Sequence, residues 1–372
     1  MRIKELDGLR GVAVLGVLSV HYLWWLPAIG SHYGWLGVDL FFILSGFLIT
    51  SILLELRDKE HYFKIFYARR ALRIFPPYFL GILVYLCVSV ALGMPGTWGL
   101  WLKYVFYYTS LFVGQPPQLH AIPPVVPFLV VLGLVGLWSL SVEEIYYTIW
   151  APVVRYTTQK GFTAILIGMI VTAPLLRWWL HTPQSPEIYT FYCRMDGLAY
   201  GSAVALLLRE RRLTPGKWLA LDKLFDRAAL LVLPITLAFW LITRGTQSNV
   251  LVVTLGLVLA DLSFALIAHA LIRRSGGNQL WVRFFRARWL RSIGKVSYSL
   301  YLFHFSLLAL SGDLVGTLRL SRHADIVAST LLGIVLSFGV AYGLWYGMES
   351  RILRWKDRRV PSPVHPEIPT PH

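Results

Sequence analysis

Cysteine is scarce in this sequence, which contains only Cys87 and Cys193. Both lie in apolar surroundings, where cysteine is more typical of inert packing than of a disulfide or a metal pair. The sequence has no metal, haem or nucleotide motif, no heptad run, no clear internal repeat and no soluble domain of any size. We therefore expect neither a bound metal nor a disulfide framework.

Acidic residues are also few, with 19 Asp and Glu against 35 Lys and Arg, so the formal net charge is +16. In a soluble protein such an excess would suggest a nucleic-acid partner. Here the positive charges cluster in short loops between apolar segments. This distribution argues against nucleic acid and points to a membrane protein.

Long apolar runs, by contrast, are abundant. Hydrophobic residues make up 56% of the 372 residues and mean hydropathy is +0.59, above the range of ordinary soluble domains. Runs of about twenty apolar residues recur along the chain, as in membrane-spanning helices. The sequence thus predicts an all-α, polytopic helical bundle in the lipid bilayer, with about ten transmembrane helices. The expected spans are 9–28, 35–54, 75–93, 131–153, 161–181, 190–208, 228–243, 250–272, 296–312 and 324–347.

The distribution of basic residues predicts the orientation of these spans. All but six of them fall on the side that holds both termini, and the positive-inside rule then places both termini in the cytoplasm. The six exceptions are Lys103, Arg177, Arg194, Arg244, Arg319 and Arg322. An additional span at 99–113 would invert this pattern, so we interpret that Trp- and Tyr-rich stretch as an outer interfacial helix. The surrounding proline-rich segment, 94–130, is either a cap over an outward cavity or an interfacial loop.

We expect a single transmembrane domain over residues 1–355, followed by a disordered cytoplasmic tail over 356–372. The first apolar segment has no small-residue cleavage site and contains an arginine and a histidine, so it is not interpreted as a signal peptide. The spacing of Gly197 and Gly201 indicates close helix packing.

His21 and Arg10 interrupt this first apolar segment. On a helix their separation is about three turns plus 20°, so both side chains share one face, about 16 Å apart along it. An ionisable group in a membrane segment costs at least a few kcal/mol, and it usually faces a protein interior or a watery cavity. We therefore interpret the two residues as a basic, proton-transferring pair directed into the core.

Five segments place ionisable side chains at a similar depth in the membrane. Counting about 1.5 Å per residue from the inner helix ends gives depths of roughly 14–19 Å, slightly outside the middle of a ~30 Å core. The side chains are His21, Glu143 and Glu144, Arg194 and Asp196, Asp261, and His304. Convergent titratable groups in a cavity are what proton-transfer chemistry requires.

Structural roles are open alternatives for most of this layer. Asp196 and Arg194 could form an internal ion pair that holds helices together. Asp261 could be a buried structural carboxylate, and His304 could simply bond a neighbouring helix. For His21 a structural role is less favoured, because it shares a face with Arg10 and a depth with a pair of glutamates.

A second basic cluster contains Arg69, Arg70 and Arg73, just before a Pro-Pro pair that we expect to begin a helix. On a helix the first two fall four and three residues before the third, so the guanidinium groups gather. Arginine clusters bind phosphates through paired hydrogen bonds. The alternative is positive-inside anchoring, which applies to every cytoplasmic loop here.

Taken together, five stretches make the chain resemble the membrane-bound acyltransferase family 3, the bacterial integral membrane O-acyltransferases of surface sugars. They are residues 5–13 (ELDGLRGVA) followed by His21, 37–49 (GVDLFFILSGFLI), 69–73 (RRALR), 137–147 (LWSLSVEEIYY) and 293–304 (IGKVSYSLYLFH). The resemblance runs from one end of the chain to the other. It implies a multi-pass enzyme of the bacterial cytoplasmic (inner) membrane.

The resemblance also implies an activity and a set of site residues. Such an enzyme takes an acyl group, usually acetyl, from cytoplasmic acyl-coenzyme A, with no permanently bound cofactor, and passes it to a hydroxyl of a glycan, a glycolipid or another acceptor. The residues that fall on family motifs are His21 and Arg10 on the first helix, Arg70 and Arg73 on the cytoplasmic arginine motif, and Glu143 or Glu144 on the Trp-Ser-Leu motif. Candidate substrate-binding or structural polar residues are Asp39, Ser141, Arg194, Asp196 and His304.

One departure concerns a further domain. Some family members carry an added periplasmic esterase-like domain, for which these 372 residues leave no room. The expectation is that the membrane domain itself or a separate periplasmic partner completes the transfer.

The mechanism we hypothesise begins with Arg69, Arg70 and Arg73 holding the phosphates of the coenzyme. His21, supported by Glu143 or Glu144, deprotonates the acceptor hydroxyl or carries the acyl group transiently. Arg10 holds the coenzyme or stabilises oxyanion charge. The rival hypotheses are a transporter or flippase of a lipid-linked sugar and O-acylation of a secreted small metabolite; a transporter would be expected to show inverted repeats.

Overall fold

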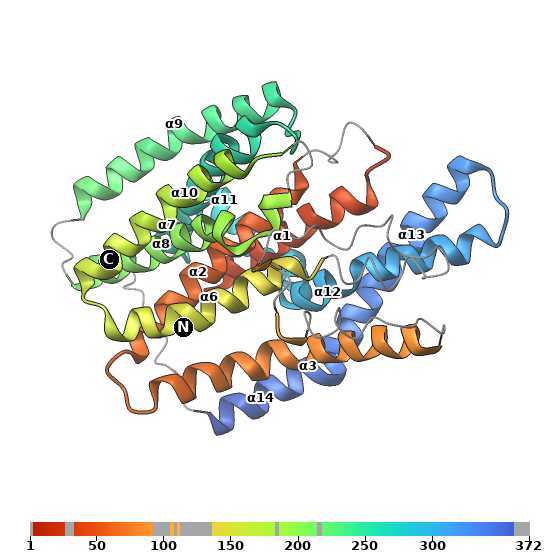
Figure 1. Ribbon diagram of the computed structural model, residues 1–372, viewed down its shortest axis with the longest axis horizontal. Coiled ribbons are helices and arrows are strands. Elements are labelled where there is room, and N and C mark those ends of the chain that lie inside the picture. Colours follow the sequence, from red (N-terminus) through yellow and green to blue (C-terminus); the bar gives the residue numbers. More distant parts are fainter. Residues whose placement is uncertain are drawn as a thin grey trace.

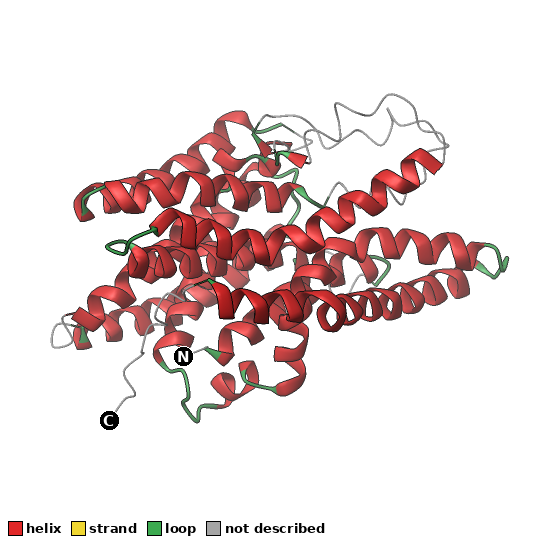
Figure 2. Ribbon diagram, turned by 90° about the horizontal axis from the view of Figure 1, so that it is seen from below, coloured by secondary structure: helices red, strands yellow, loops and turns green. Residues whose placement is uncertain are grey.

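A computed structural model describes residues 3–26, 33–91, 105–107, 110–111, 136–182, 186–213 and 218–360. Within these ranges every regular element is a helix (Figure 2). The helices are α1 (Lys4–Tyr22), α2 (Gly37–Leu56), α3 (Tyr62–Ala91), α6 (Trp138–Tyr156), α7 (Gln159–Leu180), α8 (Met195–Leu213), α9 (Leu219–Thr243), α10 (Leu257–Arg273), α11 (Leu280–Phe285), α12 (Arg288–Gly316), α13 (Arg322–Leu344) and α14 (Ser350–Arg359). Short helical turns occur at Gly34–Leu36, Pro186–Tyr189, Phe191–Cys193, Val252–Gly256 and Trp345–Glu349.

Each expected span overlaps one long helix, which confirms the all-α, polytopic architecture. Seven of the described helices, α2, α3, α7, α9, α10, α12 and α13, are long and apolar enough to cross a membrane. The other three helices at expected spans, α1, α6 and α8, are not among these seven, and each carries several charged side chains. The number of ten spans stays a prediction.

The start of α3 is where the sequence prediction was wrong. Pro76 and Pro77 were expected to begin a helix, but they lie inside α3, which begins at Tyr62. Neighbouring helices can compensate for the backbone hydrogen bonds that proline removes in a membrane helix. The arginine cluster therefore belongs to the same continuous helix as the apolar residues that follow it.

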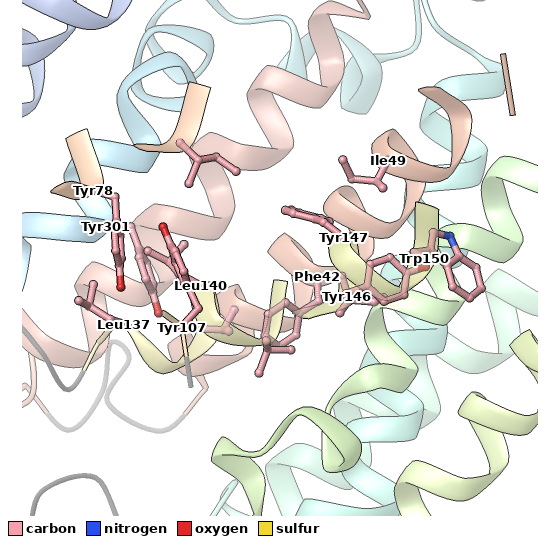
Figure 3. Close-up of a cluster of buried hydrophobic side chains, with 14 of the residues drawn as sticks. Phe42, Ile49, Tyr78, Tyr107, Leu137, Leu140, Tyr146, Tyr147, Trp150 and Tyr301 are labelled. Carbon is pink, nitrogen blue, oxygen red and sulfur yellow. The ribbon is translucent and has the colours of Figure 1, made fainter. Parts of the chain in front are cut away.

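The helices run side by side along the long axis of the molecule (Figure 1). Helix α9 lies at one edge, α1, α2, α6 and α8 lie near the middle, α3 and α14 lie at the opposite edge, and α13 lies toward one end. A large cluster of buried aromatic and aliphatic side chains fills the centre (Figure 3). In it Phe42 of α2 lies near Tyr146, Tyr147 and Trp150 of α6, and Tyr301 of α12 lies near Tyr78 of α3.

Glycines set two of the closest helix contacts. A Cβ at Gly294 of α12 would overlap the carbonyl oxygen of Asp7 of α1, and one at Gly201 of α8 would overlap that of Ile43 of α2. Only glycine lets the backbones approach so closely. The packing role predicted from the spacing of Gly197 and Gly201 is confirmed, because a Cβ at Gly197 would also press on Phe42.

Four sequence predictions concern residues that are described only in part. Helix α14 continues to Arg359, past the expected domain boundary at 355, and residues 361–372 of the expected tail lie outside the described residues. Of the expected interfacial helix at 99–113, only 105–107 and 110–111 are described. Most of the expected cap over 94–130 and the first residues of the expected span 131–153 also lie outside the described residues.

Candidate active site

A cavity of about 400 Å³ lies between α1, α12 and the segment that precedes α8. We call it the outer cavity, because its residues fall near the outer ends of their helices in the predicted orientation. Its lining combines two histidines, an arginine and several aromatic rings. The lining residues are Val17, Val20, His21, Trp35, Val38, Gly136, Trp138, Ile188, Tyr189, Arg194, Gly245, Gln247, Tyr301, His304 and Phe305.

Two histidines form a hydrogen-bonded pair in this cavity. His21 Nδ1 lies 3.1 Å from His304 Nε2, and the ring centroids are 5.0 Å apart. His304 Nδ1 lies 2.7 Å from the backbone carbonyl oxygen of Tyr301. A carbonyl oxygen only accepts, so His304 Nδ1 must carry a hydrogen.

The hydrogen positions of the pair follow from that bond. In neutral His304 the other nitrogen, Nε2, is an acceptor, so His21 Nδ1 is the donor of the bond between the two rings. The second ring nitrogen of His21, Nε2, is then left with an unprotonated lone pair. His21 Nε2 is therefore available as a base in the outer cavity. The His304 ring supports it, and the hydrogen bond to the Tyr301 carbonyl oxygen of α12 sets the orientation of that ring.

The helix turn that carries His21 is held firmly. The hydroxyl of the neighbouring Tyr22 lies within hydrogen-bond distance of three oxygens. They are the carbonyl oxygens of His304 (2.9 Å) and Gly333 (3.3 Å) and the hydroxyl of Ser337 (2.7 Å). This buried hydroxyl links α1 to α12 and α13. Phe305 packs against the His21 ring with a centroid distance of 4.0 Å, which further limits its orientation.

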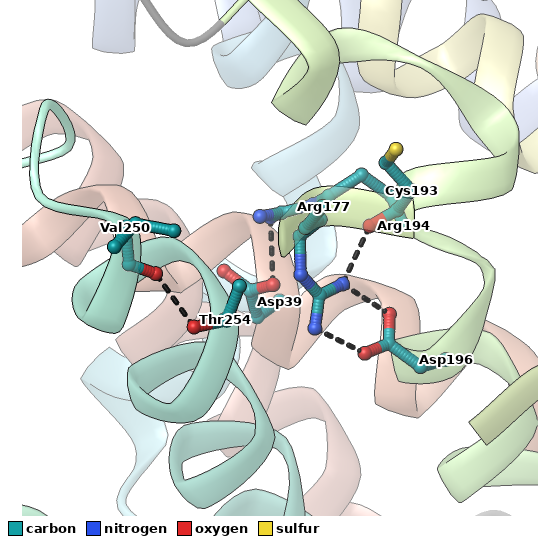
Figure 4. Close-up of polar contacts among 7 residues, drawn as sticks. All are labelled: Asp39, Arg177, Cys193, Arg194, Asp196, Val250 and Thr254. Carbon is teal, nitrogen blue, oxygen red and sulfur yellow. Dashed lines mark hydrogen bonds and ion pairs between the residues drawn. The ribbon is translucent and has the colours of Figure 1, made fainter. Parts of the chain in front are cut away.

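Arg194 lines the same cavity, but its charge is compensated. Its Nη2 donates to Asp39 Oδ1 at 2.6 Å, and both side chains are only 2% exposed (Figure 4). Phe42, Trp138 and Trp35 surround the guanidinium at 5.7 to 6.0 Å from their ring centroids. Buried ion pairs with this many additional contacts hold elements together.

A second buried pair lies beside the first. Arg177 of α7 donates to both carboxylate oxygens of Asp196, at 2.9 and 2.6 Å, and to the carbonyl oxygen of Cys193 (Figure 4). The expected pairing of Arg194 with Asp196 is therefore wrong: each residue has a different partner. A depth counted from the helix ends carries no information on which helices are neighbours.

Asp261 of α10 lies close to these pairs, and it is 1% exposed. Its Oδ1 has no hydrogen-bond partner among the described residues. It is thus a buried carboxylate next to two ion pairs, in line with the structural alternative, and it does not line the outer cavity.

A smaller pocket of about 80 Å³ lies between α1, α3, α12 and the first half of α6, and its arginines lie on the halves of α1 and α3 that the predicted orientation places toward the cytoplasm. We call it the inner pocket. It collects three arginines from two helices together with a glutamate. The lining residues are Arg10, Val38, Phe41, Phe42, Ser45, Arg70, Arg73, Ile74, Ser139, Leu140, Glu143, Tyr147, Ser297, Tyr298 and Tyr301.

Arg10 and His21 thus line different hollows, as two points on one face of α1. Arg10 lies in the inner pocket, 3.7 Å from Asp7 Oδ1, and His21 lies in the outer cavity. The guanidinium of Arg70 lies over the Tyr147 ring at 4.2 Å from its centroid, and its Nε has no hydrogen-bond partner among the described residues. Arg73 lines the same pocket and is exposed.

The glutamates are not the partners of His21. Glu143 lies in the inner pocket, where it accepts hydrogen bonds from Ser45 Oγ and the Tyr147 hydroxyl, both at 2.7 Å. Glu144 lines neither of the two hollows, and it interacts electrostatically with Arg70. The expected support of His21 by Glu143 or Glu144 is therefore wrong, and a histidine takes that position.

Two side chains, Val38 and Tyr301, line both hollows and form the wall between them. The Tyr301 hydroxyl lies 2.5 Å from Ser139 Oγ and 3.1 Å from the carbonyl oxygen of Gly136. The phenol thus closes the gap between α12 and the start of α6. Ser141, by contrast, points away: its Oγ bonds the carbonyl oxygen of Tyr107 and accepts from Ser110 Oγ at 2.8 Å, so it holds a loop.

Arg69 also differs from its neighbours in the cluster. It donates to Asp357 Oδ1 at 2.8 Å and to the carbonyl oxygen of Val360 at 2.9 Å, both at the end of α14. It is not among the residues that line the inner pocket. Arg69, Arg70 and Arg73 were all expected to bind the coenzyme. Arg70 and Arg73 lie together with Arg10 in the inner pocket, whereas Arg69 contacts the C-terminal helix.

Sequence reasoning missed three residues of the site. Arg177 was counted only as an outer basic residue, although its place near the end of an apolar run was a signal of a buried partner. Tyr301 and Tyr147 appeared in quoted motifs but were not singled out, because tyrosine is common in membrane helices.

Burial raises the pKa of Tyr189, which lies outside the spanning helices, so this phenol lines the outer cavity in its neutral form.

Together the two hollows offer separate chemistries. The inner pocket has planar, positively charged donors that match phosphate oxygens. The outer cavity has a neutral base, aromatic faces and hydroxyl or amide groups, which match an uncharged polar molecule. Among the described residues no group of three or more His, Cys, Asp or Glu side chains could hold a metal ion.

Comparisons with known proteins agree on one chemistry. A family model described as an acyltransferase domain matches residues 3–346. The chain is 27% identical over 332 residues to the peptidoglycan O-acetyltransferase OatA of Listeria monocytogenes, covering 83% of this chain and 50% of that protein. It is 28% identical over 352 residues to the putative peptidoglycan O-acetyltransferase YrhL of Bacillus subtilis, covering 83% and 49%.

A putative O-acetyltransferase of Staphylococcus aureus is 28% identical over 341 residues, with 82% of this chain and 51% of that protein covered. The chain thus spans about half the length of the curated relatives it matches. No solved structure matches it.

Proposed function

Because this chain belongs to the acyltransferase 3 family, we propose that it is a membrane O-acetyltransferase that moves an acetyl group from acetyl-coenzyme A to a hydroxyl of a cell-wall glycan. The donor binds at the inner pocket from the cytoplasm, and the acceptor binds in the outer cavity. Two of the relatives are named as a peptidoglycan O-acetyltransferase and a putative peptidoglycan O-acetyltransferase, and these names support the choice of acceptor. The proposal includes ten spans, with both termini in the cytoplasm of a bacterial cell.

One observation carries the proposal: a cationic pocket and a cavity with a histidine base share a thin wall made of Val38 and Tyr301. Acetyl transfer across a membrane needs a phosphate site on one side and a hydroxyl site on the other. It also needs a reaction centre that both substrates reach. The arginines of the inner pocket and the histidine of the outer cavity support the first two requirements, and the shared wall supports the third.

The donor site is formed by Arg70, Arg73 and Arg10. Their guanidinium groups hold the phosphates of the coenzyme, and the thin pantetheine arm passes Tyr301 toward the outer cavity. Glu143, fixed by Ser45 and Tyr147, orients the neighbouring groups of the pocket. Since the arginines lie on α1 and α3, the donor also joins these two helices.

The reaction centre is His21 Nε2. This nitrogen takes the proton from the acceptor hydroxyl as its oxygen attacks the thioester carbonyl carbon. The new C–O bond forms, the C–S bond breaks, and the coenzyme thiolate leaves with the proton that His21 returns. His304 accepts the hydrogen bond from His21 Nδ1 and so keeps Nε2 free to act as the base.

The outer cavity suits a sugar. Trp35, Trp138 and Tyr189 present broad rings with polar edges, and Gln247 offers an amide. Arg194 already has its carboxylate partner, so the cavity does not demand a strongly anionic acceptor. These features favour a neutral glycan hydroxyl over a phosphate-bearing one.

The test is transfer of labelled acetyl from acetyl-coenzyme A to glycan fragments by the purified protein in lipid nanodiscs. His21→Ala should bind donor normally and lose transfer. His323→Ala is the matched control, because this histidine is exposed on α13 and lines neither hollow. Full transfer by a folded His21→Ala protein would refute the assigned base.

The acceptor is tested separately in cells. Deletion of the gene should remove one class of O-acetyl group from the surface glycans, as measured by mass spectrometry of the isolated cell wall. Restoration by wild type and by His323→Ala, but not by His21→Ala, is the expected result. Unchanged glycan acetylation in the deletion strain would refute the acceptor.

A further inference from the structure

The C-terminal helix α14 packs along α3, on the side that carries the arginine cluster (Figure 1). It begins at Ser350, after the end of the region that matches the acyltransferase family model. Arg69 fixes it there through Asp357 and the Val360 carbonyl oxygen. The contact brings residues of α14 next to the donor site proposed above.

Lys356 is the residue of α14 that faces this contact. It is 8% exposed, whereas its neighbours Arg354, Trp355 and Arg358 are exposed. Its charged neighbours are three arginines, Arg69, Arg70 and Arg73, and one carboxylate.

That one carboxylate compensates Lys356 poorly. Asp357 Oδ1 lies 3.8 Å from the Lys356 ammonium, the Asp357 side chain is 61% exposed, and the same oxygen is bonded by Arg69 at 2.8 Å. A lysine held away from water among like charges is unfavourable unless an anion joins the group. An anion that joined this group would offset the like charges around the Lys356 ammonium.

We propose that Lys356 is a phosphate-binding residue of the donor site, so that α14 completes the site from outside the matched family region. The proposal rests on the proposed function, because it takes the donor to be an acyl-coenzyme A. Lysine binds phosphate as a compact point charge and complements the planar arginines Arg70 and Arg73. Its position beside these two residues, which line the inner pocket, favours the phosphates of the donor.

A phosphate could also come from a lipid headgroup, since α14 is basic and carries the exposed Trp355. The two sources of phosphate would reach Lys356 from different sides. Coenzyme A in solution reaches the pocket between α1 and α3, whereas a lipid reaches the exposed face of α14. The experiment therefore measures both.

The experiment uses the full-length protein in nanodiscs of neutral lipid, with coenzyme A as the probe in isothermal titration calorimetry. We expect Lys356→Gln to bind coenzyme A about tenfold more weakly, the effect of losing one hydrogen bond to a charged group. Lys356→Arg keeps the charge and should bind within about threefold of wild type. Arg358→Gln removes the same charge from the exposed face of α14, and we expect a change of less than about twofold.

A second arm measures binding to sedimented vesicles that contain phosphatidylglycerol, using the same variants. The proposal is overturned if Lys356→Gln binds coenzyme A as wild type does, or if it weakens only the binding of anionic vesicles. If Arg70→Gln still weakens coenzyme binding in that case, the proposed function stands without this part.

If wild type itself does not bind coenzyme A, the donor assignment fails, and this proposal fails with it. Size-exclusion chromatography of each variant, together with the behaviour of Lys356→Arg, separates a lost contact from a misfolded helix.

Discussion

The outer cavity and the inner pocket both contain arginine, but they treat its charge in opposite ways. In the outer cavity Arg194 is 2% exposed and paired with Asp39 at 2.6 Å. In the inner pocket Arg70 lies over a tyrosine ring and Arg73 is exposed, and both side chains line the hollow. An arginine that is compensated by the protein stabilises the fold, whereas one that faces a pocket can bind an anion.

The first way to test this contrast is to break the outer pair. Asp39→Ala leaves Arg194 buried without its carboxylate, and we expect about 3–5 kcal/mol of lost stability, as for other broken buried pairs. Denaturant titration in detergent, followed by tryptophan fluorescence, measures it. Asp58→Ala is the control, since this aspartate is exposed and should change stability by less than about 0.5 kcal/mol. Equal loss in both variants would contradict a structural role for the outer pair.

The second prediction concerns the histidine pair. His304→Ala removes the acceptor of the His21 Nδ1 hydrogen, so the base loses its orientation and tautomer. We expect kcat to fall by about 100-fold, the lower range for a proton-transfer group, with little change in KM for the donor.

His304→Gln places an amide oxygen near the former Nε2 and should recover part of the rate. Steady-state kinetics at several pH values measures both. If His304→Ala changed KM for the donor and left kcat intact, His304 would have no positioning role for His21.

The third prediction concerns the inner pocket alone. Arg70→Gln removes a charged donor that faces the hollow, so donor affinity should fall by about 1.5–3 kcal/mol, the range for a hydrogen bond to a charged group. Stability should stay the same or rise, because the neighbouring arginines repel one another less. Calorimetry with coenzyme A and the denaturant titration used for Asp39→Ala give the two values. A loss of stability as large as that of Asp39→Ala would erase the contrast between the two regions.

The smallest expected effect concerns the wall between the hollows. Tyr301→Phe keeps the ring but removes the hydroxyl contacts to Ser139 and Gly136, at a cost of about 0.5–1.5 kcal/mol. We expect hydrolysis of acetyl-coenzyme A to rise a few-fold relative to transfer, because a looser wall admits water to the donor.

The control for Tyr301→Phe is Tyr85→Phe. It removes another buried phenol bonded to α12, at Leu302 and Ser306, that lines neither hollow. A similar change in the ratio of hydrolysis to transfer for both variants would rule out the wall as its cause.

Much of the fold was predictable, because a run of about twenty apolar residues is long enough to form a membrane-spanning helix. The helical overlap with each expected span follows from this. The inward direction of Arg10 and His21 was predictable too, since eleven positions on a helix return to nearly the same face. The five motifs predicted the family, which is confirmed.

The pairing of polar residues was not predictable. Counting residues from a helix end gives depth, but it does not give the position of a helix around the bundle. Asp39 and Arg194 lie 155 residues apart in sequence, and His21 and His304 lie 283 apart. The carboxylates at the right depth were therefore assigned to His21, although its neighbour across α1 and α12 is another histidine.

The close contacts of α1 have a mechanical consequence. Cβ atoms at Gly8 and Gly11 would overlap carbonyl oxygens at Phe285 and Leu290, just as one at Gly294 would overlap that of Asp7. Backbones in such contact cannot rotate or tilt against each other at these points without separating there. The histidine pair joins the same two tightly packed helices, α1 and α12. A rocking motion of α1 against α12, as in alternating access, would therefore break the hydrogen bond between the two histidines. We therefore expect α1 and the start of α12 to move as one unit, and any opening of the outer cavity to come from rotation of individual side chains.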